Sequence, residues 1–282
     1  MNPTILALAL WPLSGCAPED PAPHDDGTIP LTARYAPVPA GTFQMGCTRG
    51  QSDCDADETE HIVTLTHAYE VGVTEVTQWQ FETTMGYNPS FQPDCGVNCP
   101  VESALWSGGA AYANALSTAA GLPECYACTG AGDGVACEVA ANPYECGGYH
   151  LLTEAEWENA ARCGADPLYS GSGDILDLGW ISDNSDGRKH DVASLAPNAC
   201  GLYDMSGNVW EWTQDWYDEY ALPVETDPTG ASSGSHHVSR GGAWDRSASL
   251  ARVSYRRAAP GMSDHGVLGF RVGRSTDIES DL

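Results

Sequence analysis

The sequence predicts an α+β fold in one compact, loop-rich domain over residues 34–275. Its 282 residues, 42% of them hydrophobic, are enough to bury one sizeable core. Some segments alternate apolar and polar residues as strands do, and others carry helix start signals, so both kinds of element are expected. From residue 165 onward Gly, Asp, Asn and Ser dominate between short apolar runs. Most of the second half should therefore be irregular loop with a few strands.

The expected regular elements lie mainly in the first 165 residues. Val38 to Gly46 alternates as an opening strand and turn would, and His61 to Tyr69 alternates over a longer span, which predicts a second strand. Thr77-Gln-Trp-Gln80 is a capping-box pattern that predicts a helix through about Met85. Ser107 is expected to cap another helix. Thr153-Glu-Ala-Glu156 carries the strongest start signal and predicts a helix to about Arg162.

The N-terminus resembles a bacterial lipoprotein signal. A short apolar run ends in Leu13-Ser-Gly-Cys16, so residues 1–15 are expected to be removed and Cys16 to carry lipid. No Lys or Arg precedes the run, so an ordinary hydrophobic N-terminus is the alternative. Residues 16–33 are acidic and Pro-rich, as a solvated tether would be, and 276–282 form a polar tail. We expect an exported monomer that is anchored by lipid in the bacterial cell envelope, in the periplasm or the outer membrane.

The charge excludes one class of partner. Twelve Lys and Arg against 39 Asp and Glu give a formal net charge of −27. Such a field repels nucleic acid and anionic lipid and attracts divalent cations or basic partners. No further run approaches the ~20 apolar residues of a membrane span. Nucleic acid is therefore excluded, and membrane contact is expected only through the lipid anchor.

The cysteines favour disulfides. Eleven cysteines minus a lipidated Cys16 leave ten, an even number beside an export signal. The sequence does not determine how they pair. The alternative for the group Cys125, Cys128, Cys137 and Cys146 is a zinc site, which an oxidising compartment disfavours.

Gly201 to Thr213 is the segment richest in chemistry. Asp204 and Glu211 offer hard oxygen ligands, and the turn Ser206-Gly-Asn208 can supply backbone carbonyls, which together suit Ca²⁺. The alternative is that Asp204 and Asn208 cap turns while the neighbouring aromatic residues fill the core.

Six motifs give the chain its family resemblance. They are Val38 to Gly46, Thr74-Glu-Val-Thr77, His150 to Arg162, Gly201 to Trp212, Ser239-Arg-Gly-Gly-Ala-Trp244 and Gly269-Phe-Arg271. Their order and spacing resemble the sulfatase-modifying factor, or formylglycine-generating enzyme, family over about residues 36–274. The resemblance implies a single domain of low regular secondary structure related to the C-type lectin-like fold.

The resemblance also implies a calcium site. It assigns Ca²⁺ to the side chains of Asp204 and Glu211 and to the carbonyls of Gly207 and Val209. It implies a second calcium site starting at Asn184-Ser185, although the loop is shorter here than in the active enzymes.

The family's oxidase binds Cu(I) through two cysteines five residues apart, and thiolates suit that soft ion. The matching positions here are Arg246 and Ala251, and the sequence holds no cysteine after Cys200. We therefore expect no copper and no formylglycine formation by that mechanism. Another branch holds iron with a His-x3-His-x-Glu pattern, which is absent here. The histidines His61, His67, His236 and His237 are interpreted as scattered surface residues, with a metal site as the alternative.

Arginines gather near the C-terminus, where the family's substrate groove has its rim. One interpretation is that Arg252, Arg256 and Arg257 pair with acidic residues in a very acidic protein. The other is a groove for a carboxylate or phosphate ligand, which Arg binds bidentately. Trp210 and Trp244 are expected either to line this groove or to lie in the core.

Three functions fit these observations. The first is a calcium-stabilised binding or accessory module that has lost the oxidase site and takes a small-molecule or peptide ligand. The second is a protein-modifying enzyme of the same fold that uses another metal or site. The third is a purely structural lipoprotein. The missing cysteines favour the first.

Overall fold

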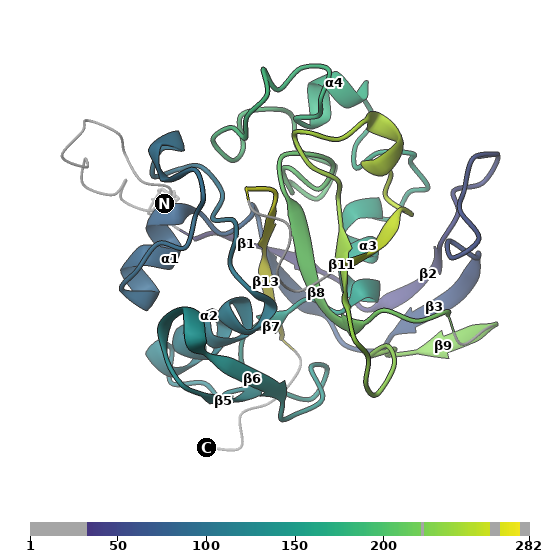
Figure 1. Cartoon of the computed structure of the whole chain (residues 1–282). Helices are drawn as coiled ribbons and strands as arrows, with labels where there is room; N and C mark the ends of the chain where they lie inside the picture. The colour runs from purple at the N-terminus through teal and green to yellow at the C-terminus, as the bar shows by residue number, and fades with distance from the viewer. Residues whose placement is uncertain (1–32, 221–222, 260–265, 277–282) are drawn as a thin grey trace, which may run out of the picture.

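The computed structural model describes residues 33–220, 223–259 and 266–276 (Figure 1). The predicted signal segment 1–15, Cys16, nearly all of the tether and all but Thr276 of the tail lie outside the described residues. The helices are α1 (Gln78–Met85), α2 (Trp106–Ala119), α3 (Glu154–Arg162) and α4 (Ile175–Leu178), with 3₁₀ turns η1 (Pro93–Cys95), η2 (Gly132–Gly134) and η3 (Ala248–Leu250). Within the described part of the chain, no helix is long and apolar enough to cross a membrane.

The strands form four small sheets. Two have four strands, in the orders β1-β4-β13-β7 and β11-β10-β8-β12, and the others join β2-β3-β9 and β5-β6. The strand bounds are β1 Tyr35–Val38, β2 Gly41–Met45, β3 His61–Leu65, β4 Tyr69–Gly72, β5 Tyr126–Thr129, β6 Ala136–Val139, β7 His150–Leu151, β8 Trp210–Trp216, β9 Val224–Thr226, β10 His237–Arg240, β11 Arg256–Ala259, β12 Leu268–Phe270 and β13 Val272–Ser275. The α+β class predicted from the sequence is confirmed.

Strand β8 organises the centre of the molecule. It pairs antiparallel with β10 on one side and parallel with β12 on the other, where Leu268 lies opposite Trp210. Helix α2 and strand β7 lie beside it on one side in Figure 1, and α3 lies on the other. The described residues of β8 before Trp216 are all buried. The site discussed below begins where this strand starts.

Two helix starts follow from local sequence, as predicted. The Thr77 hydroxyl accepts from the Gln80 amide and the Gln80 side chain accepts from the Thr77 amide, which is a complete capping box before α1. Thr153 and Glu156 form the same reciprocal pair before α3. Each box satisfies two amides that a helix terminus otherwise leaves without partners.

Two expectations were wrong. His61 to Tyr69 is not one strand: the amide and hydroxyl of Thr66 both donate to the Asp227 carboxylate, at 2.8 and 2.6 Å. The chain therefore leaves β3 and enters a different sheet at β4. The helix expected at Ser107 exists but begins at Trp106 without a side-chain cap. The Ser107 hydroxyl instead accepts from the Cys137 amide.

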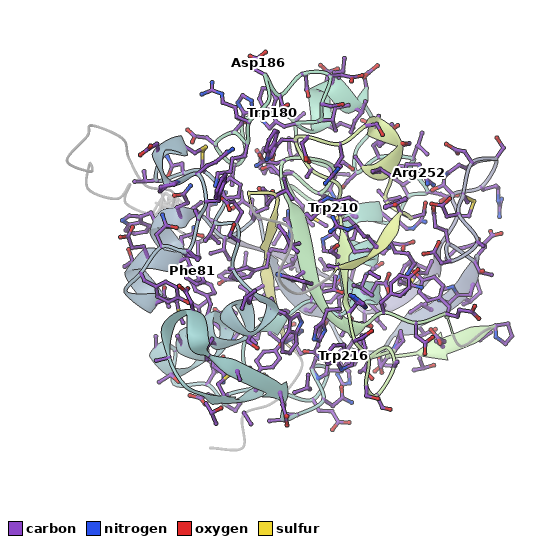
Figure 2. All side chains as sticks on the ribbon, in the orientation of Figure 1. Phe81, Trp180, Asp186, Trp210, Trp216 and Arg252 are labelled. Carbon is purple, nitrogen blue, oxygen red and sulfur yellow. A yellow bond between two sulfur atoms is a disulfide. The ribbon has the colours of Figure 1, made fainter. Side chains whose placement is uncertain are left out.

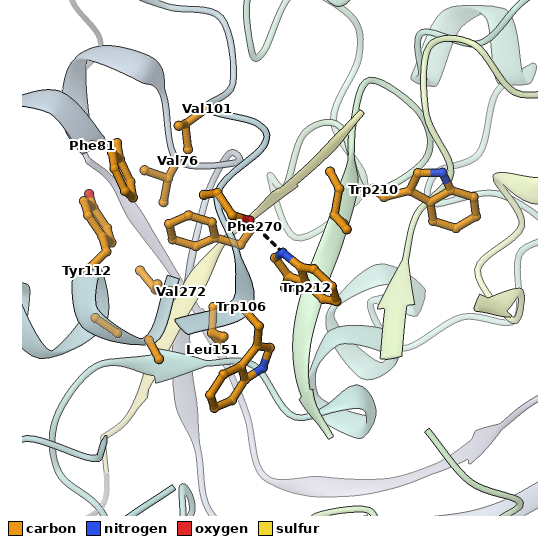
Figure 3. Packing of buried hydrophobic residues seen from close by; sticks show 14 of the residues in the cluster. Val76, Phe81, Val101, Trp106, Tyr112, Leu151, Trp210, Trp212, Phe270 and Val272 are labelled. Carbon is orange, nitrogen blue, oxygen red and sulfur yellow. Dashed lines mark hydrogen bonds between the residues drawn. The ribbon is translucent and has the colours of Figure 1, made fainter. Parts of the chain in front are cut away.

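Aromatic residues fill the interior. Figure 3 shows Phe81, Tyr112 and Phe270 packed together between α1, α2 and β12. Trp212 donates its indole N–H to the carbonyl of Ala104 at 2.9 Å, so its polar atom has a partner within the core. Trp157 belongs to a second cluster between α3 and the sheets.

All ten cysteines from Cys47 to Cys200 are paired. The disulfides are Cys47–Cys54, Cys95–Cys99, Cys125–Cys146, Cys128–Cys137 and Cys163–Cys200. The zinc alternative for the group of four is thereby excluded, because each of its sulfur atoms is bound to another.

Candidate functional site

The segment before β8 is a tightly curled turn. Asp204 and Asn208 have positive φ angles of 57° and 60°, a region that Asp and Asn enter more readily than other non-Gly residues. Gly207 has φ 96°, and a Cβ there would lie 2.4 Å from the Trp180 carbonyl oxygen. Only glycine fits this contact. The sequence of the turn therefore fixes its curvature against the loop at Trp180.

Asp204 places one carboxylate inside this turn. Its side chain is 2% exposed, and its Oδ2 accepts from the Ala193 amide at 2.7 Å. Its Oδ1 is buried and has no hydrogen-bond partner. Burial raises the pKa of Asp204 to about 6, against the opposing effect of the Ala193 hydrogen bond. A buried carboxylate oxygen without a donor is unfavourable unless a cation or water meets it.

Glu211, the second residue of strand β8, places a second carboxylate nearby. It is fully buried, and Arg271 holds both of its oxygens, with Nη2 at 2.6 Å from Oε1 and Nε at 2.7 Å from Oε2. The Trp157 indole also donates to Oε2 at 2.8 Å. An ionised carboxylate has about four lone-pair positions, and three of those on Glu211 are in use.

Glu75 is a third buried acid at this place, and it is not among the ligands predicted from the sequence. Its oxygens accept from the Val209 amide at 3.1 Å and from the Asn208 side chain at 3.0 Å. Burial, followed by the nearby Asp204 and Glu211 carboxylates, raises the pKa of Glu75 well above its usual value. Its presence in the Thr74-Glu-Val-Thr77 motif was the available signal.

Arg271 is the cationic side chain that acts on all three acids, and it is hydrogen-bonded to Glu211. No described hydrogen bond or ion pair joins Asp204 or Glu75 to a cationic side chain. The donor set of hard oxygens and the orphaned Oδ1 of Asp204 fit Ca²⁺. Across the ranges that the structure describes, no group of three His, Cys, Asp or Glu side chains is arranged as a metal site. An ion here would thus depend on backbone carbonyls for the rest of its shell.

The loop expected to hold a second ion is braced internally. The Asn184 side-chain oxygen accepts from the Ile181 amide at 2.8 Å, and its nitrogen donates to the carbonyls of Leu176 and Gly179. The Ser185 hydroxyl donates to the Trp244 carbonyl at 2.8 Å. Both side chains therefore have hydrogen-bond partners within the protein.

The positions that match the copper cysteines lie beside the Gly-Gly turn. Arg246 is partly exposed and pairs with Asp245 at 3.3 Å, whereas Ala251 is fully buried. Gly242 has φ 80°, and a Cβ there would lie 2.8 Å from the Ala251 Cα. The turn therefore closes directly over Ala251, and every described cysteine is already in a disulfide.

The structure corrects the groove expectation for three of its residues. Arg252 forms two hydrogen bonds with Glu58, at 2.7 and 2.8 Å, and is 3% exposed. Arg256 does the same with Glu154 at 2.6 and 2.8 Å. Trp210 is fully buried, so it belongs to the core. The pairing of Arg with acidic residues is thus what the structure shows at Arg252 and Arg256.

Trp244 and Arg257 remain partly exposed. The Trp244 indole donates to the Gly266 carbonyl at 2.9 Å, and the Arg257 guanidinium lies 5.1 Å from the centre of the Trp210 ring.

The histidine interpretation was wrong for two residues. His61 is 3% exposed and His237 8% exposed, because aromatic rings cover both: Tyr220 lies against His61, and Trp106 and Trp216 enclose His237.

Comparison with known proteins places the chain in one family. Residues 29–276 match the model of the "Sulfatase-modifying factor enzyme 1-like domain". The chain belongs to this family. The formylglycine-generating enzyme of Streptomyces coelicolor is 36% identical over 153 residues, which cover 47% of this chain and 49% of that enzyme.

Other relatives of the sulfatase-modifying domain match over greater lengths. "Chaperone protein LppX" of Paenibacillus barcinonensis is 32% identical over 247 residues, covering 76% of this chain and 82% of LppX. The solved structure of Treponema denticola variable protein 1 superposes with a TM-score of 0.77 at 30% identity, over 90% of this chain and 98% of that one. PvdO from Pseudomonas aeruginosa, at a TM-score of 0.67 and 23% identity, covers 88% of this chain and shares the fold.

Proposed function

We propose that this member of the sulfatase-modifying domain family is an exported, lipid-anchored binding or accessory module. It is stabilised by Ca²⁺ and does not carry out copper-dependent cysteine oxidation. Its ligand is a small molecule or a peptide. The observation that carries the proposal is the state of the sulfur atoms: all ten cysteines from Cys47 to Cys200 are in disulfides, and the positions that match the copper ligands are Arg246 and Ala251.

The calcium part rests on the buried acids before and within β8. Asp204 and Glu211 would hold the ion through their side chains, and Gly207 and Val209 through their carbonyls. The bound ion supplies positive charge to the turn. Asp204 directs its unpartnered Oδ1 into this buried region, Arg271 fixes Glu211, and Gly207 permits the close approach to Trp180.

The location rests on the disulfides and on the N-terminal sequence. Five disulfides in a chain of this size are typical of an oxidising compartment, and Cys16 follows an apolar run. A Cys16→Ser variant is the direct test. The parent should enter the detergent phase and incorporate labelled palmitate in a bacterial host, and the variant should do neither. An unlabelled parent would remove the lipid anchor from the proposal.

A further inference from the structure

A cavity of about 340 Å³ lies at the C-terminal end of β8, whereas the turn at residues 204–209 precedes the start of that strand. Its walls come from the end of β8 at Trp216, from strand β9 and from the start of α3. Figure 2 shows Trp216 well separated from Trp180 and Asp186, which lie at the opposite side of the molecule. The lining of this cavity includes no residue of the turn at 204–209 or of the Gly-Gly turn at 241–242, so the cavity is distinct from both.

The lining of the cavity is strongly acidic. It includes the carboxylates Glu154, Asp215, Asp218, Glu219 and Glu225 and one basic side chain, Arg256. Arg256 is bound by both oxygens of Glu154, so these two charges cancel. Four carboxylates remain around a space in the size range of protein binding sites.

Asp215 is the buried member of this set. It is 4% exposed, and its Oδ2 accepts from the Glu154 amide at 2.8 Å. The described hydrogen bonds give Oδ1 no donor, and Oδ1 is not one of the fully enclosed side-chain atoms without a partner. Burial, and then the Glu154 carboxylate, raise the pKa of Asp215 well above its usual value. Asp215 thus offers the cavity a carboxylate oxygen that no described protein donor occupies, and a cationic group of a ligand can donate to it.

A bare metal ion is a poor match for this cavity. In the part of the chain that the structure describes, no three acidic or histidine side chains converge as metal ligands do. The acids are instead spread around a space much larger than an ion. Trp216 and Tyr220 add aromatic surface, and the Tyr220 ring already holds the Arg256 guanidinium at 4.0 Å. Spread carboxylates and aromatic rings suit an organic cation.

A second cavity indicates that the ligand extends further. It measures about 670 Å³ and shares Trp216, Thr229 and Ala231 with the first. Its lining includes the neutral polar side chains Gln214 and Asn142. We propose that the first cavity binds the ammonium or guanidinium group of a Lys or Arg side chain, and that the peptide carrying it crosses Trp216 into the second. The net charge of −27 accelerates the approach of such a peptide.

This assignment rests on the binding role proposed above and gives it a ligand class. The two can still fail separately, because the Asp204→Asn variant should bind the basic peptide as the parent does. If the protein shows no stabilisation by calcium but binds the basic peptide, the calcium proposal fails and the cavity proposal stands. If it binds calcium but not the peptide, only the cavity proposal fails.

The test is calorimetric titration of residues 17–282 with the acetylated, amidated peptide Gly-Ser-Lys-Ser-Gly. Analogues carry Arg or the uncharged, equally long norleucine at the central position, and spermidine represents a free amine. The Lys and Arg peptides should bind saturably, and the norleucine peptide should not. The exposed pair Asp218→Asn/Glu219→Gln should weaken binding about fivefold, and Asp215→Asn about tenfold or more.

The matched control removes the same two charges elsewhere. Glu82→Gln/Asp94→Asn changes one Glu and one Asp, both exposed, in α1 and η1. It should leave the affinity within twofold of the parent. Equal weakening in both double variants would mean attraction by the overall charge and would overturn the site. Equal binding of the norleucine peptide, or binding of spermidine alone, would also overturn it. If Asp215→Asn fails to fold, the affinity of the Asp218→Asn/Glu219→Gln variant still tests the proposal.

Discussion

Arg271 donates two hydrogen bonds of 2.6 and 2.7 Å to Glu211 inside the core, whereas one oxygen of the neighbouring Asp204 has no hydrogen-bond partner. Glu211 is therefore already neutralised by an arginine, and Asp204 is not. This difference decides which residue tests the calcium site. Replacing Glu211 would leave the buried Arg271 without its counter-charge, which lowers the stability of the protein with or without a metal ion. Replacing Asp204 breaks no ion pair and should disturb the fold less.

Asp204→Asn should abolish the effect of chelator on stability. An ion that binds only the folded state at a hundredfold excess over its dissociation constant adds about 2.7 kcal/mol. That corresponds to a fall of about 5–10 °C in the melting temperature of the parent on chelation. The variant should melt at one temperature with and without chelator. The control Asp94→Asn should respond as the parent does, and an unresponsive parent would contradict the site.

Arg252 should behave as half of a buried ion pair. Arg252→Met leaves Glu58 uncompensated and should lower the free energy of unfolding by about 3–5 kcal/mol, as should Glu58→Gln. Because the two residues contact each other at 2.7 Å, the double variant should lose much less than the sum of the two. Urea denaturation measures all three. Strictly additive losses would mean that the two side chains are independent.

His237 should make stability depend on pH. It lies between Trp106 and Trp216 at 4.1 and 3.7 Å, and burial lowers its pKa from 6.5 to about 4. The unfolded chain then binds a proton at a higher pH than the folded protein. Stability from this group is complete above about pH 6.5 and is lost as the pH falls towards 4, by an amount of the order of 3 kcal/mol.

The His237→Phe variant keeps a flat ring but does not titrate. Its free energy of unfolding should therefore fall less than that of the parent between pH 7 and pH 4.5. Comparison with the parent is needed because Asp215, whose pKa is raised, acts in the opposite direction. His236→Phe is the control and should keep the parental dependence. An unchanged slope in His237→Phe would show that this histidine does not titrate as described.

The Cys163–Cys200 disulfide should contribute more stability than Cys95–Cys99. The first closes 37 residues and the second four. Loop-closure entropy predicts losses of about 4 and about 2 kcal/mol when each pair is replaced by Ala. Denaturation of the two double variants measures both losses. A larger loss for Cys95–Cys99 would indicate that local contacts outweigh chain entropy here.

The predictable part of this structure is local. The capping boxes at Thr77 and Thr153 are complete within four residues, so the sequence identifies the starts of α1 and α3. The break after Leu65 depends on Asp227, which lies 161 residues from Thr66, and no local pattern reveals it. The same holds for Glu58, Glu75 and Glu154, which would be interpreted as surface acids until their distant arginine or turn partners are known.

The sites divide in the same way. The turn at Asp204 could be predicted as a candidate site because its proposed ligands lie within eight residues of one another. At Arg252 the sequence left an ion pair and a ligand groove open, because its partner Glu58 is 194 residues away. The acidic cavity was missed, although Asp215, Trp216, Asp218 and Glu219 are close in sequence. Their alternation of acids and aromatic residues was the available signal, and β9 and α3 complete the cavity only in the fold.

The elemental metal content of the protein is the most direct test of the proposed calcium-stabilised module. Residues 17–282 are exported to an oxidising compartment, purified without chelator and washed free of loosely bound ions. We expect about one equivalent of calcium in the parent, none in Asp204→Asn, and no copper or iron in either. Stoichiometric copper or iron would contradict it, because a redox site would then exist in a protein whose cysteines from Cys47 to Cys200 are all paired.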